Sequence, residues 1–165
     1  MKKLLALSVA MATLNFACAD IIELDMQNAD ICRKQILSAK TDTVVIVDYD
    51  PGCGAWQYFE PGYENVAVKK EYLEKYTFFK AQQWNATDEV RSKCLQETGL
   101  SASPRTKIIG KRYSTKAKTV IIDNADLVVT GAMNQELLER LLNGQIFTAA
   151  NNEAIGKAPI CHPVK

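Results

Sequence analysis

Two neighbouring strings near the middle of the sequence combine side chains that can hold a phosphodiester. Lys116 and Lys118 place two positive charges two residues apart, and Asn134 follows with an amide donor. Ammonium and amide groups both donate hydrogen bonds to phosphate oxygens, and those from ammonium groups are the stronger. The first set of candidate site residues is Lys116, Lys118, Asp123 and Asn134.

The spacing of this set resembles the His-x-Lys-x-x-x-x-Asp and Gly-Ser-x-Asn signature of the phospholipase D superfamily, particularly its small periplasmic endonucleases. By position, the resemblance covers Lys118, Asp123, Gly131 and Asn134. In that family a lysine and an asparagine converge on a phosphate while a histidine attacks phosphorus, and single-motif members pair two subunits around one site. The resemblance implies a phospholipase D-like domain over residues 20–155, a phosphodiester or nucleic-acid ligand, and a homodimer.

Two departures from the signature change the activity that it implies. Lys116 stands where the family has its nucleophilic histidine, and Ala132 stands where it has a serine. A lysine with an ordinary pKa near 10.4 is protonated at neutral pH and has no lone pair for attack, unlike an imidazole with a pKa near 6.5. We therefore expect a catalytically impaired pseudoenzyme that binds without efficient cleavage. In the alternative interpretation, Asp123 and Asn134 serve only a turn and a helix cap.

Further cations lie in the same part of the chain, because residues 105–118 contain no acidic residue. Such a stretch is either a solvated strand face or a stripe that faces phosphate groups. The phospholipase D resemblance also extends to residues 147–153, which match the segment after the family's asparagine. The ligand-binding candidates are Arg105, Lys107, Lys111, Arg112, Asn152 and Glu153.

The cysteines offer a different chemistry. Four of them follow residue 19, namely Cys32, Cys53, Cys94 and Cys161. An even number in an oxidising compartment indicates two structural disulfides, with three possible pairings. A reactive thiol at Cys53 is the alternative. The sequence lacks a Cys-x-x-Cys spacing and has one histidine, so we expect neither a metal site nor a cofactor.

A second resemblance is built on Cys53, Trp56 and Pro104, whose order along the chain is similar to that in thioredoxin. In that family a thiolate at a helix start attacks disulfides, a second cysteine three residues on resolves the adduct, and a cis-proline lies opposite. Trp56 stands at the position of the second cysteine, so the resemblance implies a periplasmic thiol protein acting through Cys53. We favour the phospholipase D-like interpretation and keep two alternatives, this one and a structural or adaptor role.

The predicted elements form an α/β fold with a mixed sheet and helices on both faces. Asn28 can cap a helix over residues 28–39, and the unbroken apolar run within residues 43–49 predicts a strand buried on both faces. We also expect a loop over residues 50–61, helices over residues 66–76 and after Thr87, and a leucine-rich helix after residue 134. Extended segments are expected at residues 77–81, 105–109, 119–122 and 127–129, with a turn at residues 124–126.

The N-terminus predicts export from a bacterial cell. Residues 1–19 combine a positive start, a short apolar run and a small-x-small cleavage pattern, which leaves Asp20 first in a periplasmic or secreted protein. Removing two lysines and no acids changes 20 cations and 19 acids to 18 and 19, so net charge does not indicate a nucleic-acid partner. No later segment is long and apolar enough to span a bilayer. Residues 156–165 are expected to form an irregular tail.

Overall fold

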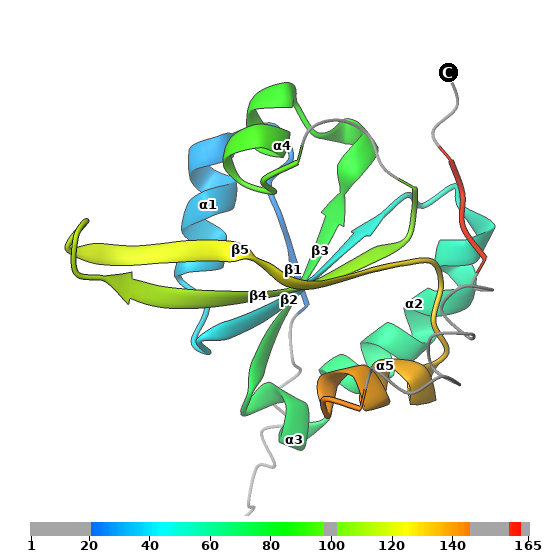
Figure 1. Cartoon of the computed structure of the whole chain (residues 1–165). Coiled ribbons are helices and arrows are strands. Elements are labelled where there is room, and N and C mark those ends of the chain that lie inside the picture. Colours follow the sequence, from blue (N-terminus) through cyan, green and yellow to red (C-terminus); the bar gives the residue numbers. More distant parts are fainter. Residues whose placement is uncertain (1–20, 98–101, 146–158, 163–165) are drawn as a thin grey trace, which may run out of the picture.

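The computed structural model describes residues 21–97, 102–145 and 159–162, which contain a five-stranded mixed sheet. Its order is β1-β3-β2-β4-β5 (Figure 1). Strands β1 and β2 both run parallel to β3, whereas β4 is antiparallel to β2 and β5. The strands are β1 (Ile22–Glu23), β2 (Thr43–Tyr49), β3 (Tyr76–Gln82), β4 (Arg105–Ser114) and β5 (Thr119–Thr130).

Helices cover both faces of this sheet, and the β4–β5 hairpin extends beyond them on one side (Figure 1). One face carries α1 (Ala29–Leu37) and α4 (Asp88–Lys93). The other carries α2 (Gly54–Ala67), α3 (Lys70–Leu73) and α5 (Gln135–Leu142). A short 3₁₀ helix, η1 (Gln83–Asn85), follows β3. None of the described helices is long and apolar enough to cross a membrane.

Strand β2 lies in the middle of the sheet and separates two hydrophobic cores. Its side chains alternate, so that Val45 and Val47 pack toward α2 while Val44 and Ile46 pack toward α1. All four are fully buried. This confirms the strand that the apolar run predicted, and it explains why the run does not alternate with polar residues.

Helix α1 begins as its sequence predicted. The Asn28 side chain accepts hydrogen bonds from the backbone N–H groups of Asp30 and Ile31, and Cys32 and Ile36 face the core. These bonds occupy donors that the first helical turn leaves free. A disulfide from Cys32 to Cys94, with Cα atoms 6.1 Å apart, ties α1 to the end of α4.

Helix α2 corrects the loop predicted for residues 50–61. Trp56, Phe59 and Tyr63 recur at three- and four-residue spacing and are buried against the sheet, which stabilises a helix in spite of Pro61 within it. The helix predicted over residues 66–76 is likewise wrong, because α2 ends at Ala67 and only the short α3 follows before β3.

Strand β5 corrects the turn predicted at residues 124–126. The strand continues through them, and β4–β5 pairing shifts register between Ile108 and Ile109 and between Ile109 and Lys111. An irregularity of this kind bends a hairpin without ending it. The chain reverses instead between Ser114 and Thr119, where Lys118 has a positive φ of 53°.

Candidate functional site

Cys53 occupies the position immediately before the first residue of α2. Its backbone N–H donates to Asp50 O at 3.0 Å, and its carbonyl accepts from Gln57 N at 3.1 Å, which starts the helix. The residue makes no side-chain cap, and the first turn of α2 has no acidic residue. The N-terminal end of a 14-residue helix, which carries partial positive charge, therefore lies next to Cys53.

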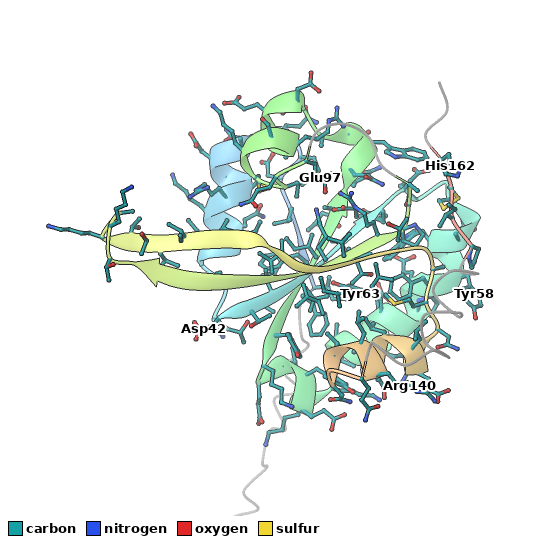
Figure 2. All side chains as sticks on the ribbon, in the orientation of Figure 1. Asp42, Tyr58, Tyr63, Glu97, Arg140 and His162 are labelled. Atoms are coloured by element: carbon teal, nitrogen blue, oxygen red, sulfur yellow. A yellow bond between two sulfur atoms is a disulfide. The ribbon has the colours of Figure 1, made fainter. Side chains whose placement is uncertain are left out.

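The Cys53 sulfur is bonded to Cys161, 108 residues further along the chain. The Cα atoms of the two cysteines are 5.9 Å apart. Cys53 is only 2% exposed, whereas Cys161 is partly exposed. Figure 2 shows the neighbouring His162 on the same side of the molecule as Tyr58 of α2, far from the tip of the β4–β5 hairpin.

Ser103 joins the elements around this disulfide. Its backbone pairs with Cys161 as an isolated antiparallel bridge, through Ser103 N to Cys161 O at 2.8 Å and Cys161 N to Ser103 O at 2.7 Å. Its hydroxyl accepts from Asp50 N at 3.0 Å. The carbonyl of Ser103 lies 3.5 Å from the Cys53 sulfur, and the peptide bond to Pro104 is cis.

Trp56 has a structural position, three residues after Cys53. It is 1% exposed, and its ring centroid lies 4.8 Å from that of Tyr49. Lys80 Nζ lies 5.9 Å from the Trp56 ring centroid, a cation–π distance. Trp56 therefore fills the core beside the cysteine and supplies no second sulfur.

A buried group of four charges lies on the opposite face of the sheet, between the end of β2 and the end of α4. Asp48 Oδ1 is 3.0 Å from Lys107 Nζ, and Asp48 Oδ2 is 3.1 Å from Arg105 Nε. Lys107 Nζ also lies 2.5 Å from Glu97 Oε1, and Arg105 forms an ion pair with Glu97. Asp48 is fully buried and Lys107 is 3% exposed. We call these four residues the buried charge cluster.

The pKa values of the two carboxyl groups in the buried charge cluster are shifted in opposite directions. Burial raises the pKa of Asp48 to about 6, and the nearby Glu97 adds to this, while Lys107 and Arg105 act against it. Burial also opposes ionisation of Glu97, but Lys107 and Arg105 outweigh it and hold the pKa of Glu97 below its usual value. The cluster is thus a source of pH-dependent stability.

The structure does not bring the predicted phosphate site together. Lys116 and Lys118 are exposed at the tip of the β4–β5 hairpin. Asn134 lies beyond the far end of the 12-residue β5, which at about 3.3 Å per residue separates it from the tip by more than roughly 30 Å. The Asn134 side chain instead caps α5, accepting from Leu137 N at 2.8 Å. The catalytic set predicted from these residues and Asp123, which falls within β5, is therefore wrong.

The residues of the predicted cationic stripe do not form one surface either. Arg105 and Lys107 belong to the buried charge cluster, and Lys111 Nζ donates to Ala39 O at 2.7 Å, just after α1. Arg112 lies in β4, with its backbone paired to Ile121. Asn152 and Glu153 lie outside the described residues. Within the described ranges, no group of three or more His, Cys, Asp or Glu residues could hold a metal ion.

Comparison with known proteins shows which fold the chain resembles. Neither a protein-family model nor a curated protein matches the sequence. Among solved structures, the long form of thioredoxin f from spinach chloroplast is similar over 84% of this chain and 99% of its own, with 23% identity and a TM-score of 0.50. The short form gives the same identity and TM-score over 78% and 96% of the two chains.

The phospholipase D-like fold, and with it the endonuclease-like pseudoenzyme, is therefore wrong. The two lysines and the asparagine do not converge, and the fold is similar to that of thioredoxin f. In the part of the chain that the structure describes, neither the nucleic-acid ligand nor the homodimer that the resemblance implied is shown.

The alternative set of Cys53, Trp56 and Pro104 does lie in one region. Cys53 directly precedes the first residue of α2. Pro104 follows the cis peptide bond of Ser103, whose carbonyl lies beside Cys53, and β4 begins directly after Pro104. The sequence reasoning missed the contribution of Cys161, because no spacing signal links residues 108 apart. At the level of its fold, the chain is thioredoxin-like.

Proposed function

We propose that the protein performs thiol–disulfide exchange, with Cys53 as the exchanging sulfur and Cys161 as its resolving partner. The observation that carries this proposal is the disulfide between a cysteine at the start of α2 and a cysteine from a distant segment. Cys161 would then take the part that a nearby second cysteine plays in thioredoxin, at whose position this chain has Trp56.

The start of α2 favours Cys53 as the nucleophile and as the leaving group. A helix N-terminus carries partial positive charge, which favours a thiolate over a neutral thiol at the residue before the helix. A sulfur with a lower pKa leaves a disulfide faster. An incoming thiolate that attacks the sulfur of Cys161, the less buried of the two residues, therefore expels Cys53 as a stabilised thiolate.

The proposed reaction with a target conserves atoms and electrons. The Cys53 thiolate of the reduced protein attacks one sulfur of a target disulfide, forms a mixed disulfide and releases the other target sulfur as a thiolate. Cys161 then attacks the Cys53 sulfur and releases the second target thiolate. The target gains two electrons, and the protein returns to the disulfide seen here.

A stepwise reduction tests the proposal. The oxidised protein is titrated with a dithiol, its free thiols are alkylated, and the modified cysteines are identified by mass spectrometry. We expect Cys53 and Cys161 to be released well before Cys32 and Cys94, because both sulfurs of the second pair come from residues that are at most 1% exposed. The reduced protein should then reduce a small chromogenic disulfide.

Three variants separate exchange from a purely structural role. Cys53→Ser should abolish reduction of the chromogenic disulfide, whereas Cys161→Ser should stop at a mixed disulfide on Cys53. The double variant Cys32→Ala, Cys94→Ala is the matched control, since it removes the other disulfide and leaves the exchanging pair intact. Unchanged activity in Cys53→Ser, or simultaneous opening of both disulfides, would leave only a structural role.

We also propose that exchange takes place outside the cytoplasm. Two disulfides support this compartment, since such bonds persist in oxidising surroundings. The pattern of residues 1–19 supports it independently. Mass spectrometry of protein from the periplasm or the culture medium should find Asp20 as the first residue, and an intact Met1 would contradict cleavage.

A further inference from the structure

Residues 159–162 form a short segment, here called the strap, that lies across the site of Cys53. Besides its two backbone bonds with Ser103, the strap accepts a hydrogen bond at Pro159 O from Ala132 N, at 2.8 Å. The disulfide from Cys161 to Cys53 is its covalent attachment. The strap therefore bridges the loop before β4 and the segment before α5.

The side chains of the strap contribute little to its attachment. Pro159 and His162 are exposed, and Ile160 is 41% exposed. Cys161 is the side chain of the strap that packs against the core around α2. Ordering a residue costs conformational entropy of the same order as the net stabilisation from one hydrogen bond. The three backbone bonds that the strap makes with other described residues are thus insufficient for its four residues, and the disulfide holds the strap in place.

The strap also covers the groups that surround the Cys53 sulfur. Ser103 is fully buried and Ala132 is 4% exposed, and both use backbone N–H groups to bind the strap. Cys53 is 2% exposed in the same state. While the strap is bound, these two N–H groups are occupied, and Cys53 is too deeply buried to contact another polypeptide.

We propose that the strap is a redox-released cover over Cys53. This inference rests on the proposed exchange at Cys53 and adds its regulation: the oxidised form is closed, and reduction opens the site. A thiolate of a dithiol reductant attacks the Cys161 sulfur, and Cys53 leaves as a thiolate. The second thiol of the reductant then attacks the reductant sulfur bonded to Cys161, which releases the Cys161 thiolate and leaves the reductant as a disulfide. Two electrons pass to the protein, and the two protons lost by the reductant go to the cysteines or to solvent.

Amide hydrogen exchange on the full-length protein tests strap release. The oxidised wild type is compared with Cys161→Ser, which cannot form the bond and keeps the Cys32–Cys94 disulfide. We expect the amides of Ser103 and Ala132 to exchange at least about tenfold faster in the variant. Gly131 N, which donates to Pro104 O at 2.8 Å without involving the strap, is the internal control and should keep its rate.

A second measurement guards against a variant that folds poorly. Wild type is reduced with enough dithiol to open Cys53–Cys161 alone, and the same amides are followed. Continued protection of Ser103 and Ala132 in both experiments would overturn the proposal, even if Cys53 exchanges with disulfides. Faster exchange at both amides supports strap release, whether or not Cys53 is reactive. An unreactive Cys53 would refute the proposed function but not strap release.

Discussion

At the scale of single residues, Asp48 is a buried carboxyl group whose surroundings oppose its ionisation. It is fully buried, and it shares Lys107 and Arg105 with Glu97. Two bases facing two acids make the group nearly neutral when all four are ionised. Desolvation nevertheless dominates at Asp48, which is why its pKa rises to about 6.

The raised pKa of Asp48 predicts a loss of stability as pH rises. The folded protein holds the Asp48 proton up to about pH 6, whereas the unfolded chain releases it near the ordinary value of 3.8. Ionisation of Asp48 therefore favours the unfolded state between these two pH values, by about 3 kcal/mol in free energy. In Asp48→Asn this contribution is absent, so the free energy of unfolding of wild type relative to the variant should fall between pH 4 and pH 7.

Urea denaturation at a series of pH values measures this difference. The control is Asp88→Asn, which removes an exposed carboxylate from α4. If the wild-type and Asp48→Asn curves stay parallel from pH 4 to pH 7, the raised pKa is contradicted.

At the scale of elements, Asn134 acts as the N-cap of α5, and this role can be tested against a role in ligand binding. Asn134→Ala should lower the free energy of unfolding by about 1 kcal/mol, because the N–H of Leu137 loses its acceptor. Asn134→Ser and Asn134→Asp should retain most of the stability, since both side chains can cap a helix. Chemical denaturation of the three variants measures their free energies of unfolding. An equal loss of stability in all three would contradict the capping role.

Helices α2 and α5 approach closely at Gly62. A Cβ at this position would lie 3.3 Å from the backbone N of Gln135, whereas a Cβ at Gly54 would meet nothing within 4 Å. Gly62→Val should therefore displace α5 and cost about 1–3 kcal/mol, because backbone cannot move aside as a flexible side chain can. Gly54→Val in the same helix is the matched control. Equal thermal stability of the two variants would contradict close packing at Gly62.

The sequence predicted those elements whose signals are local. Asn28 marks the start of α1, and the apolar run of residues 43–49 marks β2, because capping and burial act through neighbouring residues. Helix α2 was missed since the Pro-Gly pairs before it and within it, at residues 51–52 and 61–62, are typical of turns. Its helical state depends on burying Trp56 against the sheet. The prediction of a phosphate site was wrong for a related reason, because residue types at matching spacing do not ensure that their side chains converge.

At the scale of the whole molecule, the two disulfides constrain the chain in different ways. Cys32–Cys94 joins two helices, and the cysteines at both of its ends are buried in one hydrophobic core. Cys53–Cys161 joins α2 to the strap, which makes three backbone hydrogen bonds. Their sequence separations are 62 and 108 residues. Loop entropy in the unfolded chain alone predicts about 4–5 kcal/mol for each bond, and slightly more for the longer loop.

When the folded state is also considered, the order is reversed, and Cys32–Cys94 is expected to stabilise the protein more than Cys53–Cys161. Breaking Cys53–Cys161 frees the strap in the folded protein as well, so the folded state regains entropy and the net loss is small. Breaking Cys32–Cys94 leaves α1 and α4 packed, and the full entropy gain goes to the unfolded chain. The double variant Cys32→Ala, Cys94→Ala should therefore have a lower free energy of unfolding than Cys53→Ala, Cys161→Ala, by several kcal/mol. Guanidinium denaturation of both variants measures the difference, and a larger loss in Cys53→Ala, Cys161→Ala would show that the strap stabilises the fold as a fixed part of it.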